Sequence, residues 1–94
     1  MINGKTAEEI GLVNKAVPEE EVLKQAKGLA KKIAAKSRPA IERILRVTRE
    51  GLAGSLEEGL KLEAKLFGEL CGMHDMKEGL TAFLEKRQPR FEDR

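Results

Sequence analysis

Apolar residues recur every three or four positions through most of this chain, and glycines, prolines and capping residues interrupt them at short intervals. This spacing places the apolar residues on one face of a helix, because an α-helix has about 3.6 residues per turn. The chain is therefore predicted to be all-α, with four amphipathic helices after a short N-terminal segment. The predicted helices run from Glu19 to near Ser37, from about Pro39 to Gly51–Gly54, from Ser55 to Gly72, and from Asp75 to Pro89.

Capping signals and apolar stripes support these helices. Ser55 with Glu58, and Asp75 with Glu78, have the spacing of capping boxes at the starts of the last two helices. Each helix carries an apolar stripe that is expected to be buried. The stripes of the last two helices are Leu56, Leu60, Ala64, Phe67 and Cys71, widened by Leu66 and Leu70, and then Met76, Leu80, Phe83 and Leu84.

The first eighteen residues differ from the rest of the chain. A short helix is expected there, capped either by Asn3 or by Thr6 with Glu9. Gly11 suits the left-handed position beyond a helix end, and residues 12–17 are predicted to be extended up to Pro18. A single strand has no ladder partner in this chain, so these residues resemble the edge of a larger structure.

Size and composition limit the classes of function. The chain has 94 residues, a net charge of +2 and 3% aromatic residues, which describes one modest domain or part of one. The nearly balanced charge argues against nucleic-acid binding, which needs a clustered excess of lysine and arginine. A single cysteine, Cys71, excludes an internal disulfide and fits a reducing compartment. No stretch approaches the roughly 20 apolar residues that cross a bilayer, so a cytoplasmic location is expected.

Two stretches at opposite ends of the chain resemble one known family. Residues 10–18 are IGLVNKAVP, similar to the Gly-Leu-Val-Asn-x-Val-Val-Pro signature that closes the spiral core of crotonase-fold proteins. Residues 75–91 are DMKEGLTAFLEKRQPRF, similar to the C-terminal pattern Asp-x-x-Glu-Gly-x-x-Ala-Phe-x-Glu-Lys-Arg-x-Pro-x-Phe of the same proteins. The chain thus resembles the C-terminal segment of a crotonase-superfamily protein, in the enoyl-CoA hydratase and isomerase family.

This resemblance implies the last part of a longer protein. Residues 1–18 would be the edge of the crotonase core, and residues 19–94 the C-terminal helical oligomerisation region. In the family, the oxyanion hole and the paired catalytic glutamates lie upstream, so this chain alone is predicted to have no catalytic residues and no activity. The parent is expected to hydrate a 2-enoyl-CoA, or to carry out a related isomerisation, without a metal or redox cofactor.

The resemblance also implies two contacts to coenzyme A from the last helix, often in a neighbouring subunit. Phe83 would lie against the adenine and Lys86 would reach the phosphates, with Arg87 and Arg90 as weaker candidates. Residues three apart share a helix face, so this ring and this ammonium can meet one ligand. A plainer interpretation stays open, in which Phe83 is a core residue beside Leu80 and Lys86 is a favourable charge at a helix C-terminus.

Other candidate sites are weaker. Cys71, His74 and Asp75 are not expected to bind a metal, because three ligands within five residues at a helix end do not surround one ion. Cys71 is expected to be a small buried apolar residue rather than a nucleophile. The adjacent pairs Glu8–Glu9 and Glu57–Glu58 are not expected to replace the missing glutamates, because neighbouring helical residues point in diverging directions.

Two functions therefore stay open. In the first, the helices associate with other copies as a dimer or trimer, or with the crotonase core, and roof the acyl-CoA site. In the second, the chain is a stand-alone helical protein-interaction module that does not bind coenzyme A. Acyl-chain specificity, and the choice between hydratase and isomerase, depend on residues upstream of this chain.

Overall fold

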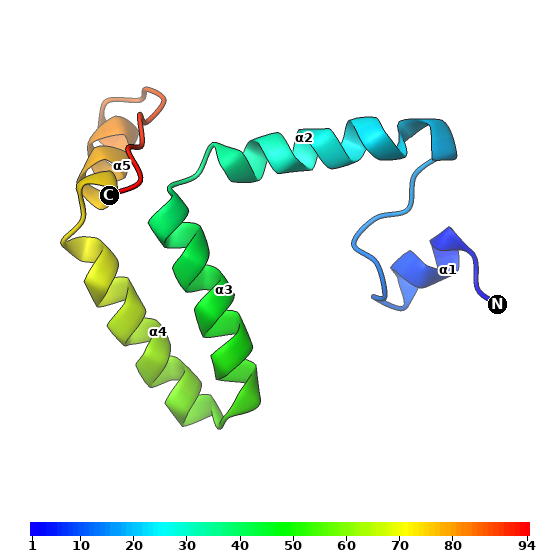
Figure 1. Ribbon diagram of the computed structural model, residues 1–94, viewed down its shortest axis with the longest axis horizontal. Coiled ribbons are helices and arrows are strands. Elements are labelled where there is room, and N and C mark those ends of the chain that lie inside the picture. Colours follow the sequence, from blue (N-terminus) through cyan, green and yellow to red (C-terminus); the bar gives the residue numbers. More distant parts are fainter. The chain divides into compact units, whose positions relative to one another are not determined.

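The computed structural model describes residues 1–94 and is all-α, as predicted, with no strand. Its elements are α1 (Gly4–Glu9), the 3-10 turn η1 (Glu19–Glu21), α2 (Val22–Ala34), α3 (Arg38–Ala53), α4 (Leu56–Cys71) and α5 (His74–Leu84) (Figure 1). The four amphipathic helices α2–α5 confirm the prediction from the spacing. None of the helices has the length and apolar character needed to span a membrane. The chain divides into two compact units, Met1–Lys31 and Lys32–Arg94.

Within the first unit, side-chain and backbone hydrogen bonds fix the ends of α1. The Thr6 amide donates to Asn3 Oδ1 at 2.8 Å, so Asn3 is the N-cap. Beyond the helix, Gly11 has a φ of 78°, and the amides of Leu12 and Val13 both donate to the Ala7 carbonyl, at 2.9 and 3.3 Å. The predicted extended stretch is therefore wrong in its first half, because the chain bends back to satisfy a carbonyl at the helix end.

In the second unit, α3 and α4 form an antiparallel pair (Figure 1). Leu66 is 2% exposed and is the most deeply buried large side chain of the pair. The helices approach most closely at two glycines, since a Cβ placed on Gly59 would lie 3.3 Å from Gly51 Cα. A salt bridge of 3.3 Å between Arg43 and Glu69 lies further along the pair.

The buried face of α4 includes only the part of the predicted stripe formed by Leu66 and Leu70. Its partly or fully buried positions are Gly59, Leu62, Leu66 and Leu70. Leu56, Leu60 and Phe67 of the predicted stripe are 79%, 55% and 59% exposed. The contact between Gly59 and Gly51 explains why these residues are exposed. The face of α4 that carries Gly59 packs against α3, so the face with the larger apolar side chains stays open.

The starts of α3 and α4 are capped in different ways. At α4, the Glu58 amide donates to Ser55 Oγ at 3.1 Å and the Ser55 amide donates to Glu58 Oε2 at 3.4 Å, which confirms the predicted capping box. At α3, the Ser37 side chain does not cap the helix that it precedes. Instead, the Arg38 amide donates to Asp93 Oδ1 at 2.8 Å, across 55 residues of sequence.

The last helix begins and ends differently from the prediction. Its N-cap is Met73, which makes no side-chain capping bond. The predicted capping box of Asp75 and Glu78 is wrong, because both carboxylates accept hydrogen bonds from the chain that follows α5. The helix ends at Leu84 rather than at Pro89.

Candidate functional site

The C-terminal end of α5 closes in a turn built around Lys86. The Lys86 amide donates to the Phe83 carbonyl at 3.3 Å, and the Arg87 amide donates to the Ala82 carbonyl at 3.0 Å. This pair of bonds is the Schellman arrangement, in which the residue after the helix cap adopts the left-handed conformation. Lys86 is that residue, with a φ of 56°. Glycine is the usual occupant, so a lysine here is unusual.

Phe83 and Lys86, the two predicted coenzyme A contacts, are both exposed at this turn. Phe83 is 80% exposed, whereas its neighbour Ala82 is 1% exposed. Within this chain Phe83 is therefore not a core residue. The predicted burial of the α5 stripe is also wrong for Leu80 and Leu84, which are 59% and 79% exposed. The face that α5 buries carries Asp75 and Ala82 instead.

Glu78 binds the segment that follows this turn. Its carboxylate accepts both Arg87 guanidinium Nη groups, at 2.8 and 2.9 Å, and the Arg90 amide at 2.7 Å. The bond from Arg87 is the main reason that the pKa of Glu78 falls to about 2 from an ordinary 4.5. The same partner raises the pKa of Arg87 above its already high ordinary value. Arg87, predicted as a weaker phosphate contact, is thus already paired.

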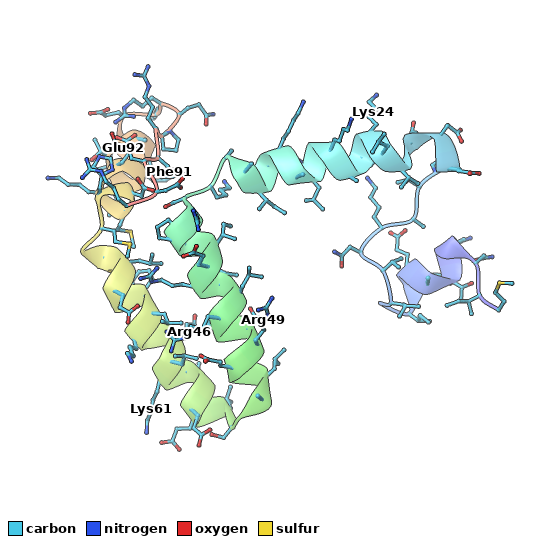
Figure 2. The ribbon with its side chains drawn as sticks, in the orientation of Figure 1. Lys24, Arg46, Arg49, Lys61, Phe91 and Glu92 are labelled. Carbon is cyan, nitrogen blue, oxygen red and sulfur yellow. The ribbon has the colours of Figure 1, made fainter.

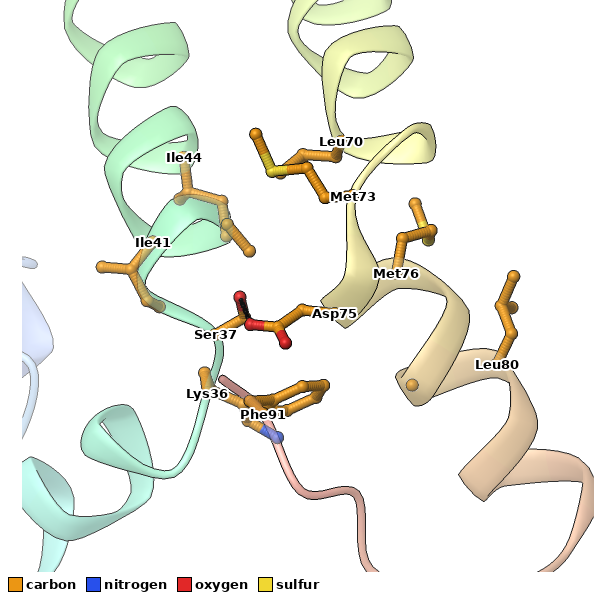
Figure 3. A pocket seen from close by; sticks show the side chains of 12 residues that line it. Lys36, Ser37, Ile41, Ile44, Leu70, Met73, Asp75, Met76, Leu80 and Phe91 are labelled. Atoms are coloured by element: carbon orange, nitrogen blue, oxygen red, sulfur yellow. Dashed lines mark hydrogen bonds between the residues drawn. The ribbon is translucent and has the colours of Figure 1, made fainter. Parts of the chain in front are cut away.

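Asp75 binds the end of the chain to the starts of two helices. Its carboxylate accepts Ser37 Oγ at 2.5 Å and the amides of Glu92 and Asp93 at 2.8 and 2.9 Å. The Asp75 amide in turn donates to the Arg94 carbonyl at 2.8 Å. Phe91 and Glu92 consequently lie beside α5 (Figure 2). Figure 3 shows the buried bond between Ser37 and Asp75.

The electrostatics of Asp75 follow from these bonds. Burial by itself would raise the pKa of its carboxyl group. The hydrogen bonds outweigh burial, the one from Ser37 most strongly, and hold this pKa well below its ordinary value of 3.8. A carboxylate in the first turn of α5 also interacts favourably with the helix dipole. Asp75 is therefore ionised at neutral pH and serves as an acceptor.

Ser37, Asp75 and His74 are close together but do not form a nucleophilic triad. His74 Nδ1 lies 3.1 Å from Asp75 Oδ1, and Ser37 Oγ donates to the other carboxylate oxygen. A triad needs the imidazole between the hydroxyl and the carboxylate, so that the imidazole can take the hydroxyl proton. Here the carboxylate lies in the middle and the serine has no base.

An apolar groove of about 410 Å³ lies beside these residues in the second unit. Ile41 and Ile44 of α3, Leu70 of α4 and Leu80 of α5 are among its lining residues (Figure 3). The Phe91 ring forms part of the wall and packs on Gly79, where an added Cβ would lie 3.5 Å from ring atom Cε1. At the edge of the groove, Ser37 and Asp75 are hydrogen-bonded to each other. The groove can therefore bind an apolar group but presents no reactive side chain.

The remaining candidate residues do not form a functional site within this chain. Cys71 is exposed, so its predicted burial is wrong. It is the last residue of α4, on the stripe that α3 does not cover. No three histidine, cysteine or acidic side chains gather as metal ligands would. Glu8 Oε2 accepts the Ala16 amide at 2.7 Å, and Glu57 pairs with Lys61 at 3.1 Å, so the adjacent glutamates do not converge on a substrate.

Acidification is expected to release the C-terminal segment from α5. Glu78 and Asp75 have pKa values lowered by folding, so their stabilisation is complete above their ordinary values of 4.5 and 3.8 and is lost as the pH falls below them. Between pH 4.5 and 2, the hydrogen-exchange protection of the Arg90 and Glu92 amides should fall about tenfold or more. Exchange measured by NMR tests this. Equal loss of protection at Leu66 would instead indicate global acid unfolding.

The Enoyl-CoA hydratase/isomerase family profile matches residues 1–94, which is the whole chain. The chain belongs to this family. It is 46% identical over 91 residues to a Bacillus subtilis protein named "probable enoyl-CoA hydratase", covering 96% of this chain and 35% of that protein. It is 40% identical over 91 residues to crotonyl-CoA hydratase of Syntrophomonas wolfei, covering 97% and 35%.

The fold of the chain is similar to that of family members of known structure. An enoyl-CoA hydratase from Bacillus anthracis matches with a TM-score of 0.91 and 31% identity, over 96% of this chain and 35% of that one. The predicted resemblance to enoyl-CoA hydratases is therefore confirmed in sequence and in fold. The chain spans about a third of the length of these relatives.

Two sets of contacts made by residues of the C-terminal motif were not predicted from the sequence. The pairing of Glu78 with Arg87 joins two residues nine positions apart, and the Asp75 bonds reach 17 and 18 positions ahead. Helix periodicity does not predict these contacts, because the chain leaves the helix after Leu84 and folds back on it. The available signal was the high density of charged residues in residues 85–94.

Proposed function

We propose that this chain is the C-terminal helical part of a protein that hydrates a 2-enoyl-CoA. Its helices would hold copies of the protein together, and Phe83 and Lys86 would contribute to the coenzyme A pocket. Family membership supports the hydratase reaction, with an isomerase as the alternative within the same family. In this proposal residues 1–18 are the edge of the core, residues 19–94 are the oligomerisation region, and the protein is cytoplasmic.

The exposed end of α5 carries the proposal for coenzyme A. Phe83 presents an aromatic ring that is 80% exposed, three residues before a lysine in a left-handed turn. Stacking of a base on an aromatic ring contributes about 1–3 kcal/mol. A lysine ammonium suits phosphate as a point charge on a flexible stem. The ring and the ammonium together fit the adenine and phosphates of coenzyme A.

Exposed apolar residues support the proposal of association. In the second unit, large apolar side chains that are at least about half exposed are Ile33, Ile44, Leu45, Leu52, Leu56, Leu60, Phe67, Leu80, Phe83 and Leu84. Open apolar surface of this kind marks contact with another protein surface. It supports equally the alternative of a stand-alone helical interaction module. Binding of coenzyme A distinguishes the two functions.

Replacing Lys86 by glycine is expected to strengthen the fold and weaken coenzyme A binding. Glycine adopts positive φ without strain, so the free energy of unfolding should rise by about 1 kcal/mol. Loss of the ammonium should weaken coenzyme A binding about threefold to fivefold from a dissociation constant on the order of 1 mM. Urea unfolding followed by circular dichroism and an NMR titration of the full chain measure the two effects.

Matched variants and one further measurement complete this test. Lys77→Ala removes an exposed lysine earlier on α5 and should leave coenzyme A binding unchanged. Phe83→Ala should weaken binding, whereas Leu84→Ala, at 79% exposure, should not. Sedimentation equilibrium of the same samples tests association, with a helical dimer or trimer expected. An associated chain that gives no Lys86-dependent response to coenzyme A would establish the interaction module instead.

A further inference from the structure

We propose that Glu78 is a positioning residue for Lys86, because it holds the backbone of the turn from which Lys86 would reach the phosphates of coenzyme A. The inference rests on the proposed coenzyme A contact of Lys86. Glu78 itself would touch no ligand and would act by fixing the backbone conformation at Lys86.

Glu78 forms hydrogen bonds with both ends of the segment that follows Lys86. Arg87 follows Lys86 directly and gives its guanidinium to the Glu78 carboxylate in a bidentate pair of 2.8 and 2.9 Å. Arg90 gives its amide to the same carboxylate at 2.7 Å. The Glu78 side chain is only 16% exposed, so solvent screens these bonds less than it screens surface ion pairs. One carboxylate on the body of α5 therefore fixes residues 87–90.

Lys86 needs such support because its backbone conformation is unfavourable for a lysine. The left-handed conformation, with a φ of 56° at Lys86, costs a residue with a Cβ roughly 1–2 kcal/mol. Two backbone bonds close the turn, but the Lys86 amide bond is long, at 3.3 Å. Strained residues persist where the surrounding structure determines their conformation. Glu78 constrains the backbone next to Lys86, because it binds Arg87 and Arg90.

The distribution of charge then leaves Lys86 available to a ligand. Arg87 is paired with Glu78 and, through Nε at 2.6 Å, with Glu85, which largely offsets its charge. The Lys86 ammonium forms no ion pair. A polar hollow of about 580 Å³ nearby is lined by Glu78, Arg87, Gln88 and Arg90, but the Glu78 carboxylate within it would repel a phosphate. An anion is therefore expected at Lys86 rather than in the hollow.

A double-mutant cycle on the full chain tests the inference. Glu78→Gln keeps the size of the side chain and removes its charge. The Lys86 backbone should then leave the left-handed conformation, which the amide-to-α-proton coupling constant of Lys86 measures by NMR. Coenzyme A binding should weaken about as much as in Lys86→Ala, threefold to fivefold. The double variant should be no weaker than either single variant, because both remove the same contact.

Two control variants separate positioning from general effects of charge and folding. Glu85→Gln removes an equal charge from the same guanidinium, at an exposed position, and should change neither the coupling constant nor binding. Arg87→Lys keeps the positive charge but loses the bidentate geometry, and should reproduce the effect of Glu78→Gln in part. If Glu78→Gln unfolds α5, Arg87→Lys carries the same test.

The outcomes distinguish this inference from the proposed function. If Lys86→Ala binds coenzyme A as well as the unchanged chain does, the proposed contact is wrong, whatever Glu78 does. If Lys86→Ala weakens binding but Glu78→Gln does not, or if the two effects add in full, Glu78 does not position Lys86. An unchanged Lys86 coupling constant in both Glu78→Gln and Arg87→Lys would overturn the inference without any ligand.

Discussion

Replacing Leu66 by alanine is expected to lower the free energy of unfolding by about 3 kcal/mol, because it empties the most buried large side-chain position between α3 and α4. A small helical unit has only a few kcal/mol of net stability, so the variant should be largely unfolded at room temperature. Urea unfolding followed by circular dichroism measures the change. A midpoint within error of the unchanged chain would show that Leu66 is not the centre of this core.

Leu60→Ala is the matched control for Leu66, on the same helix and with the same atoms removed. Leu60 is 55% exposed, so the free energy of unfolding should change by less than about 0.5 kcal/mol if the chain is a monomer. A cost as large as that of Leu66→Ala would mean that the exposed stripe of α4 is buried by a second copy. The comparison therefore also tests the proposed association.

A leucine at Gly59 is expected to separate α3 from α4, at a cost of about 2–3 kcal/mol. Helix propensity alone would favour the substitution by about 1 kcal/mol. The close approach of α3 makes the net effect on the free energy of unfolding a loss, because even a Cβ at Gly59 would lie 3.3 Å from Gly51 Cα and 3.4 Å from its carbonyl oxygen. Backbone atoms of the opposite helix cannot move aside as a flexible side chain can. The unfolding midpoint in urea measures the loss.

Gly68 provides the control for Gly59 on the same helix. No atom lies within 4 Å of a Cβ built on Gly68, so Gly68→Ala should gain about 1 kcal/mol from helix propensity. Opposite signs at Gly59 and Gly68 are the expected result. A loss at both positions would show that glycine is needed in α4 for a reason other than the contact with α3, such as a partner on the open face.

Local signals in the sequence predicted the helices well. The three- and four-residue spacing located α2 to α5, and the Ser55 capping box located the start of α4, because both depend on residues within one or two turns. The family motif in residues 75–91 could be recognised for the same reason, because its seventeen positions are contiguous. Phe83 and Lys86 were selected in this way and lie exposed at one turn.

Features that depend on distant residues were not predictable. Leu60 and Leu66 both belong to the predicted stripe, and the burial of Leu66 alone follows from the contact of Gly51 with Gly59, which no single-helix pattern contains. Asp75 and Ser37 are 38 positions apart. The sequence predicted that Asp75 caps its own helix, whereas its carboxylate binds residues that only the fold brings near. The stripe itself was recognised correctly as apolar. Which side of this α4 stripe packs against α3 depends on both helices together.

The cap of α3 has a consequence for how the protein is made. The Arg38 amide obtains its acceptor from Asp93, 55 residues later. During synthesis, which proceeds from the N-terminal end, α3 and α4 can pair early because their contacts are close in sequence. The side-chain cap on the first turn of α3 nevertheless forms only after residue 93 has emerged from the ribosome. A nascent chain that pauses before that point would hold a frayed helix start, exposed to chaperones and proteases until translation resumes.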